Sequence, residues 1–168
     1  MKNFVLGFLA MNAVLVFGLW GYLRLGLAEV QADVHASVWE RQLMNLAVRA
    51  SVRRSAGKAQ NPLPPTDETL VSGGILYLNG CAGCHGDPAK PRALTRAYFV
   101  PPPRFGLAGT QYSEPELFWI VKHGIRRTGM SSYGPFYTDQ QIWSLASFVK
   151  QMKNLSPTVL EGLQPKKP

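Results

Sequence analysis

The chain has 168 residues, which is enough for one ordinary folded domain and an appendage but too few for two sizeable hydrophobic cores. It carries 18 Lys and Arg against 10 Asp and Glu, a formal net charge of +8. This excess is spread along the sequence, with +4 in residues 1–60 and +4 in residues 61–168, so there is no basic tail and we do not expect nucleic acid as a partner.

The N-terminal segment is apolar enough to cross a membrane. Residues 4–23 form a run of 20 residues with no charge and one polar side chain, Asn12. As a helix with a rise of about 1.5 Å per residue, the run spans roughly 30 Å of hydrocarbon, which predicts a transmembrane anchor over residues 1–24. A cleaved signal peptide is the alternative, because residues 26–28 form a small-residue sequence, although the run exceeds a usual signal core. Under both interpretations, the rest of the chain is exported from the cytoplasm.

Residues 25–65 connect this anchor to the part of the chain that we expect to fold. Within them, residues 37–55 form a predicted basic amphipathic helix, whose apolar side chains recur at spacings of four, three and four: Trp39, Leu43, Leu46 and Ala50. Its arginines suit an anionic lipid surface, its apolar stripe suits a partner subunit, and a solvated spacer is the alternative without a binding role. Residues 61–65, Asn-Pro-Leu-Pro-Pro, predict a stiff linker that ends the helix.

The remaining sequence predicts three short helices and no strand, which makes the fold class all-α. The first helix follows the N-cap residue Thr66 and continues to the cysteines. The second starts in a capping box at residues 113–116 and stops at Gly124, and the third repeats the capping pattern at residues 138–141. Between the first and second helices, residues 88–111 hold five of the 13 prolines without periodicity, so we expect a long loop that wraps around something.

Three short helices bury little surface, so a domain of this size needs a covalent staple or a cofactor at its centre. The only two cysteines lie in the sequence Cys-Ala-Gly-Cys-His at residues 81–85. A disulfide between them would close a very small loop, a zinc site would lack further clustered ligands, and a thiol redox pair would lack its βαβ context. The pattern is the attachment signature of c-type haem, so we predict one covalent haem c. Cys81 and Cys84 would add to the two vinyl groups of the porphyrin, and His85 would be the proximal ligand of the iron.

A sixth ligand for the iron is predicted in the sequence Arg-Arg-Thr-Gly-Met at residues 126–130. Met130 lies in a loop between the second and third helices, whereas the other four methionines fall in the anchor or in predicted helices. His123 is the alternative and would give two histidine ligands. Ligation by His85 and Met130 raises the reduction potential and leaves no open iron position for oxygen or peroxide chemistry. This ligand set favours electron transfer over catalysis, so we do not expect an enzyme.

The domain resembles a class I cytochrome c over residues 66–158, and residues 159–168 then form a C-terminal tail. The resemblance rests on a small and an aromatic residue before the haem motif, the motif itself, a Leu and aromatic pair in the last helix and a Gly-Met loop: Gly73, Tyr77, Cys81, Cys84, His85, Leu145, Phe148 and Met130. It implies that the first helix crosses the last at Gly73 and Tyr77. It also implies a proline whose carbonyl accepts a hydrogen bond from His85, for which residues 101–103 are three candidates. We expect further haem contacts from five side chains: Tyr77, Leu94, Phe105, Trp119 and Tyr133.

The sequence is similar to those of membrane-anchored monohaem bacterial cytochromes. This similarity implies a single-pass protein of the bacterial cytoplasmic membrane, whose haem domain faces the periplasm and transfers single electrons between respiratory partners. A membrane oxidase, reductase or quinol-oxidising complex would be the donor or acceptor, with the chain as its subunit or docked to it. Basic side chains are expected around the haem edge, where they would steer an acidic partner: Lys90, Arg104, Lys122, Arg126 and Arg127. A haem enzyme or gas sensor, in which Met130 dissociates from the iron, is the alternative function.

Overall fold

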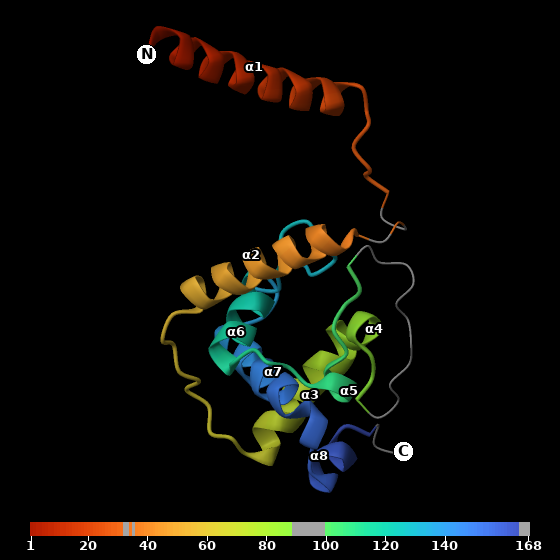
Figure 1. Cartoon of the computed structure of the whole chain (residues 1–168). Coiled ribbons are helices and arrows are strands. Elements are labelled where there is room, and N and C mark those ends of the chain that lie inside the picture. The colour runs from red at the N-terminus through yellow and green to blue at the C-terminus, as the bar shows by residue number, and fades with distance from the viewer. Residues whose placement is uncertain (32–33, 35, 89–99, 165–168) are drawn as a thin grey trace. The chain divides into compact units, whose positions relative to one another are not determined.

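The computed structural model describes residues 1–31, 34, 36–88 and 100–164 (Figure 1). Every regular element in these ranges is a helix, so the predicted all-α fold class is confirmed. The elements are α1 (Lys2–Arg24), α2 (Val38–Ala56), α3 (Asp67–Gly80), α4 (Ala82–His85), α5 (Phe105–Ala108), α6 (Glu114–His123), α7 (Asp139–Gln151), the 3-10 turn η1 (Met152–Asn154) and α8 (Pro157–Gly162). Contacts divide the chain into two compact units, residues 1–32 and residues 33–168.

The first unit consists of α1 and the residues that follow it. The apolar side chains of α1 are exposed along the helix, and its 23 residues are long and apolar enough to make it a candidate membrane span. Asn12 donates a hydrogen bond from Nδ2 to the carbonyl oxygen of Phe8 at 2.7 Å. This polar side chain is therefore satisfied within its own helix, which a hydrocarbon environment requires.

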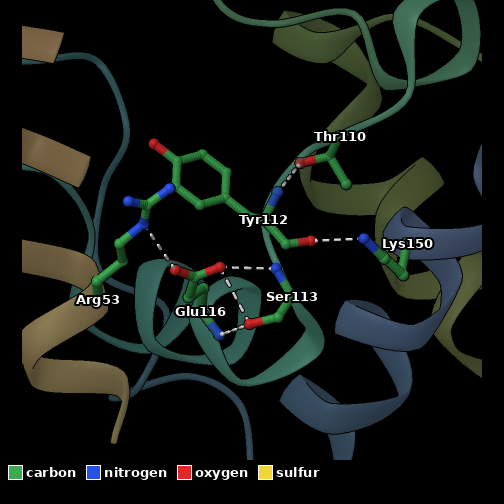
Figure 2. Close-up of polar contacts among 6 residues, drawn as sticks. All are labelled: Arg53, Thr110, Tyr112, Ser113, Glu116 and Lys150. Carbon is green, nitrogen blue, oxygen red and sulfur yellow. Dashed lines mark hydrogen bonds and ion pairs between the residues drawn. The ribbon is translucent and has the colours of Figure 1, made fainter. Parts of the chain in front are cut away.

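In the second unit, α2 packs against α6 (Figure 1). Ser37 caps α2 by accepting a hydrogen bond from the Glu40 N–H at 3.4 Å. Val52 is the α2 side chain that becomes buried. Beside it, Arg53 Nε lies 3.9 Å from Glu116 Oε1 on α6 (Figure 2). The predicted helix is thus present, and it is docked on the folded domain.

The proline-rich linker is held by α6 and α7. Asn61 Nδ2 donates hydrogen bonds to Glu114 Oε2 at 2.9 Å and to Ser147 Oγ at 2.7 Å, and Asn61 Oδ1 accepts one from the Leu63 N–H. The linker therefore follows the surface of the domain. Because α2 and the linker both pack on it, the domain boundary predicted after residue 65 does not coincide with the boundary between the two compact units, which falls after residue 32.

The core of the second unit lies where α3 crosses α7. At the crossing, Gly73 lies against the backbone of Ser144, and a Cβ atom on Gly73 would overlap the Ser144 carbonyl oxygen. The close approach buries Tyr77 and Phe148, whose ring centroids are 5.5 Å apart. The crossing predicted at Gly73 and Tyr77 is confirmed. Because α3 and α6 both pack on α7, every α7 residue from 142 to 149 is buried.

Side-chain caps mark where the helices of this unit begin. The caps are Thr66 for α3, Ser113 with Glu116 for α6, and Thr138 with Gln141 for α7, as the sequence predicts. Figure 2 shows the α6 capping box, in which Glu116 Oε2 accepts a hydrogen bond from the Ser113 N–H at 2.7 Å. The same view shows Lys150 Nζ donating to the Tyr112 carbonyl oxygen at 2.9 Å, which ties the start of α6 to α7.

The chain continues into the core beyond the predicted end of the domain. Ser156 Oγ accepts a hydrogen bond from the Val159 N–H at 3.2 Å and caps α8, whose first residue is Pro157. Val159 is fully buried in the core, and α8 packs against α3. The boundary predicted after residue 158 falls inside this helix. Ser-Pro is a helix-start signal that the sequence analysis did not use.

Candidate functional site

A large apolar cavity opens between helices α3, α4, α6 and α7 and two loops. It encloses about 1080 Å³, including the solvent at its mouth. One part of the lining, which we call the α4 wall, comes from residues 81–85 and 100–105. A second part, the α6 wall, comes from residues 117–133, and the rest comes from α3, from α7 and from Tyr112 just before α6. Cys81, Cys84 and His85 thus share one cavity with Met130.

The α4 wall follows from the local sequence. The chain leaves α3 and makes one more helical turn, in which the amides of Cys84 and His85 donate hydrogen bonds to the Cys81 carbonyl oxygen at 3.1 and 2.9 Å. Residues i and i+3 or i+4 lie on the same side of such a turn. The five-residue motif therefore brings both sulfur atoms and the imidazole to the same part of the cavity without help from distant residues.

The imidazole of His85 is oriented by the proline-rich loop. Its Nδ1–H donates a hydrogen bond to the Pro103 carbonyl oxygen at 2.9 Å, and its ring stacks on Phe105 with centroids 4.9 Å apart. Among the three candidate prolines, the histidine partner is thus Pro103. Burial lowers the pKa of His85, and the Pro103 carbonyl opposes that effect. The imidazole is neutral near pH 7, and Nε2 keeps its lone pair for a metal.

The two thiols differ in exposure, since Cys81 is buried and Cys84 is exposed, and they are not joined in a disulfide. Burial, and to a smaller extent the neighbouring Cys84, raises the pKa of Cys81 to about 11. Cys81 is therefore protonated at neutral pH as a free thiol. Among the described residues, no group of three His, Cys, Asp or Glu side chains could hold a metal ion.

Two tyrosines line the cavity and tie its surroundings together. The Tyr77 hydroxyl donates a hydrogen bond to the Gly86 carbonyl oxygen at 2.7 Å, just after α4. The Tyr133 hydroxyl donates to the Gly80 carbonyl oxygen at 2.8 Å and so joins the α6 wall to the end of α3. Burial raises the pKa of both phenols, so they remain neutral donors. The cavity therefore has fixed walls but no buried charge from these groups.

Met130 reaches the cavity on a loop that folds back against the end of α6. The Ile125 N–H donates a hydrogen bond to the Met130 carbonyl oxygen at 3.0 Å, and the Met130 N–H donates to Thr128 Oγ1 at 3.1 Å. Gly124 lies under this loop with a φ of +69°, and a Cβ atom there would come within 2.7 Å of the Met130 carbonyl oxygen. Gly124 thus meets both the left-handed conformation and the close approach that the loop requires.

The structure places the other predicted site residues as follows. Tyr77, Phe105 and Tyr133 line the cavity, whereas Leu94 lies outside the described residues. Trp119 is not part of the lining, so its predicted haem contact stays a prediction: α6 presents Leu117, Ile120 and Val121 to the cavity. Trp119 lies off that face because of the 3.6-residue helical period, and its ring centroid is 5.0 Å from that of His123. His123 is exposed and does not line the cavity.

Several apolar lining residues were not assigned by the sequence analysis: Val100, Tyr112, Leu117, Ile120, Val121, Ile125 and Val149. Periodicity does not distinguish a side chain that packs on a neighbouring helix from one that borders a cavity, since both are removed from water. Leu117, Ile120, Val121 and Val149 share one feature, an apolar side chain on the face of α6 or α7 that borders the cavity.

The basic side chains expected around the site are arranged unequally. Arg126 and Arg127 are exposed beside the Met130 loop. Lys122 Nζ contacts both carboxylate oxygens of Asp139 at 2.7 and 2.9 Å, so its charge is balanced within the domain. Arg104 is half-buried, and Lys90 lies outside the described residues. Of these five residues, Arg126 and Arg127 on the α6 wall are therefore the ones whose described, exposed charge could attract an acidic partner.

The cavity fits a flat apolar group that is attached on one side and coordinated at its centre. Two thiols lie one helical turn apart, and a neutral imidazole has one nitrogen left for a metal. An all-helical domain built in this way is that of a c-type cytochrome, the class of electron-transfer protein that binds haem c.

Comparison with known proteins agrees with this class. Residues 68–149 match the sequence model of the family described as "Cytochrome C oxidase, cbb3-type, subunit III". The matched region takes in nearly all of α3, then α4 to α6 and most of α7, and the match supports a class I c-type cytochrome domain. No curated protein and no solved structure matches the chain.

Proposed function

We propose that the chain transfers single electrons through one covalently attached haem c, whose iron is ligated by His85 and Met130. The observation that carries this proposal is that both side chains line one apolar cavity. Nδ1 of His85 is engaged by the Pro103 carbonyl oxygen, which leaves Nε2 for the iron. When bound, haem c supplies the exchange of one electron at its iron. If His85 and Met130 both ligate the iron, no ligand position would be left for a substrate, so the site would suit electron transfer and not chemistry on a bound substrate.

The chain's own residues hold the group and adjust its properties. Cys81 and Cys84 are spaced for thioether bonds to two vinyl groups. The hydrogen bond to Pro103 fixes the orientation of the His85 ring and makes its Nε2 more basic, and so a stronger ligand for the iron. The mainly apolar lining disfavours the extra positive charge of the oxidised form, and the Met130 thioether acts in the same direction, so both raise the reduction potential.

The proposed location is the periplasmic face of a bacterial cytoplasmic membrane. Three features support it: α1 is a candidate membrane span, Lys2 at its start favours an N-terminus on the cytoplasmic side, and haem c attachment is typical of exported domains. The matched family is described as a subunit of a cytochrome oxidase, which supports a membrane oxidase complex as the electron partner. Alkaline carbonate extraction of membranes tests the anchor, because an anchored chain stays with the membrane pellet.

Two measurements on the full-length protein, produced in cells that attach haem c, test the proposed chemistry. Mass spectrometry under denaturing conditions should give the mass of the chain plus one haem. An anaerobic potentiometric titration, followed by absorbance, should give one transition that involves one electron. A mass equal to that of the chain alone would contradict covalent attachment, and a two-electron transition without haem absorbance would indicate thiol chemistry at Cys81 and Cys84.

A further inference from the structure

One side of α2 remains apolar and exposed although the helix is docked on the cytochrome domain. Val52, which packs toward α6, is 1% exposed. Trp39, Leu43 and Leu46 are 69%, 56% and 67% exposed, and Ala50 is exposed as well. At about 100° per residue, these four side chains fall within an arc of roughly 60° that points away from Val52. We call Trp39, Leu43, Leu46 and Ala50 the α2 stripe.

Arginines border the α2 stripe. The helix contains four arginines and one glutamate, which gives it a net charge of 4 − 1 = +3. By the same helical period, Arg53 and Arg54 lie about 20° beyond the two edges of the stripe, whereas Glu40 lies farther around the helix. Both arginines are exposed. The surface that covers the stripe must therefore accept apolar side chains and carry negative charge.

A second copy of the chain is a poor occupant of the α2 stripe, because pairing would bring two helices of charge +3 together. An anionic membrane surface offers both an apolar layer and lipid phosphates. It is also within reach, since residues 25–37 join α1 to α2 and extend over at most about 45 Å. Trp39, near the start of α2, is a residue type that favours the headgroup region of a bilayer.

We propose that the α2 stripe lies in the interface of an anionic membrane, with Arg54 directed at lipid phosphates. This proposal rests on the proposed anchoring of the chain by α1. Because Val52 and the contact between Arg53 and Glu116 join α2 to α6, the same contact restrains the orientation of the haem cavity at the membrane surface. The mouth of the cavity then faces membrane-bound partners in only a limited range of orientations.

Hydrogen exchange of the haem-loaded, full-length chain tests this proposal. One chain is placed in each lipid nanodisc, made either from phosphatidylcholine alone or with phosphatidylglycerol added, and exchange is measured in α2 by mass spectrometry. We expect α2 amides to exchange about tenfold more slowly in the anionic discs. Leu46→Glu should remove this protection. The matched control is Ser51→Glu, which adds the same charge at an exposed α2 position outside the stripe and should keep the protection.

Equal exchange of α2 in the two kinds of disc would overturn the proposal, and so would equal effects of the two glutamate variants. Protection that appears only when two chains share a disc, or when membrane proteins are added, would also overturn it and would identify a protein as the occupant. Carbonate extraction separates these outcomes from a failure of the anchor. If α1 anchors the chain, the wild type and both variants stay with the membrane pellet whatever α2 does.

Discussion

The α4 wall and the α6 wall of the cavity position their proposed iron ligands by different means. On the α4 wall, residues 81–85 form one helical turn, and a hydrogen bond to Pro103 completes the orientation of the imidazole. On the α6 wall, Met130 lies in an irregular loop that depends on Thr128, on the backbone after α6 and on the space at Gly124. The first arrangement is local in sequence, and the second is assembled from tertiary contacts.

This difference separates the covalent attachment of haem from the adjustment of its coordination and reduction potential. A covalent bond formed within one helical turn persists when the domain opens locally, whereas a loop thioether is lost as soon as its loop moves. We therefore expect changes on the α4 wall to decide whether haem is held at all. Changes on the α6 wall should alter the coordination and the potential of haem that stays attached.

The largest effect is expected when the α4 wall is broken by Cys81→Ala together with Cys84→Ala. The variant should carry no covalent haem, and its domain should lose cooperative unfolding because the apolar cavity then lacks its filling group. Haem staining after denaturing electrophoresis and thermal unfolding by circular dichroism measure both effects. Covalent haem in the double variant would contradict the assignment of these cysteines.

A large effect is also expected at the crossing of α3 and α7, which supports both walls. Gly73→Ala places a methyl group against the Ser144 carbonyl oxygen and should lower the free energy of unfolding by about 3 kcal/mol. Denaturant unfolding of the haem-loaded protein measures the change. Gly83→Ala is the matched control, because no atom of a described residue outside its own helical turn lies within 4 Å of the added Cβ. A similar loss in both variants would mean that close packing at Gly73 is not the cause.

A change on the α6 wall should alter the reduction potential of the haem without affecting its covalent attachment. Met130→Ala should keep the covalent haem but lower the reduction potential, by a sizeable part of the roughly 0.8 V range that axial ligands span. Potentiometric titration measures the shift. Met44→Ala is the control, because Met44 is an exposed methionine of α2 outside the cavity lining. An unchanged potential in Met130→Ala would show that Met130 is not a ligand.

The smallest effect is expected from Thr128→Val, which removes the hydrogen bonds of Thr128 Oγ1 with the Met130 N–H and the Ile125 carbonyl oxygen. Because Thr128 is exposed, the loop should be destabilised by no more than about 1 kcal/mol. The readout is a faster exchange of Met130 for added imidazole at the iron. Thr110→Val removes the matching bond to the Tyr112 N–H in the other loop and should leave this rate unchanged.

The sequence predicts well what is local and poorly what depends on tertiary contacts. The motif at residues 81–85 and the helix caps at Thr66 and Ser113 are set by neighbouring residues, so their structures follow from short patterns. Pro103 could not be chosen from three adjacent prolines, because that choice depends on where the loop passes His85. A short pattern carries no information on that path.

Two further differences have the same origin. On α6, the pattern marks several apolar or aromatic side chains, and only packing decides that Leu117 and Val121 border the cavity while Trp119 does not. On α2, the predicted apolar stripe is the exposed side, and the helix docks through Val52, which lies outside that stripe. The docked side of α2 is set by one buried side chain, Val52, and one ion pair, Arg53 with Glu116. These do not produce a periodic pattern of apolar residues in the sequence.

The coordination of the iron by two protein ligands is tested most directly by carbon monoxide. The absorption spectrum of the reduced, full-length protein is recorded before and after the gas is added, with Met130→Ala as the variant that has an open position. We predict that the wild-type spectrum stays unchanged over seconds, while the variant binds the gas. Rapid binding by the wild type would contradict ligation by His85 and Met130, and it would favour a gas sensor or haem enzyme over an electron-transfer protein.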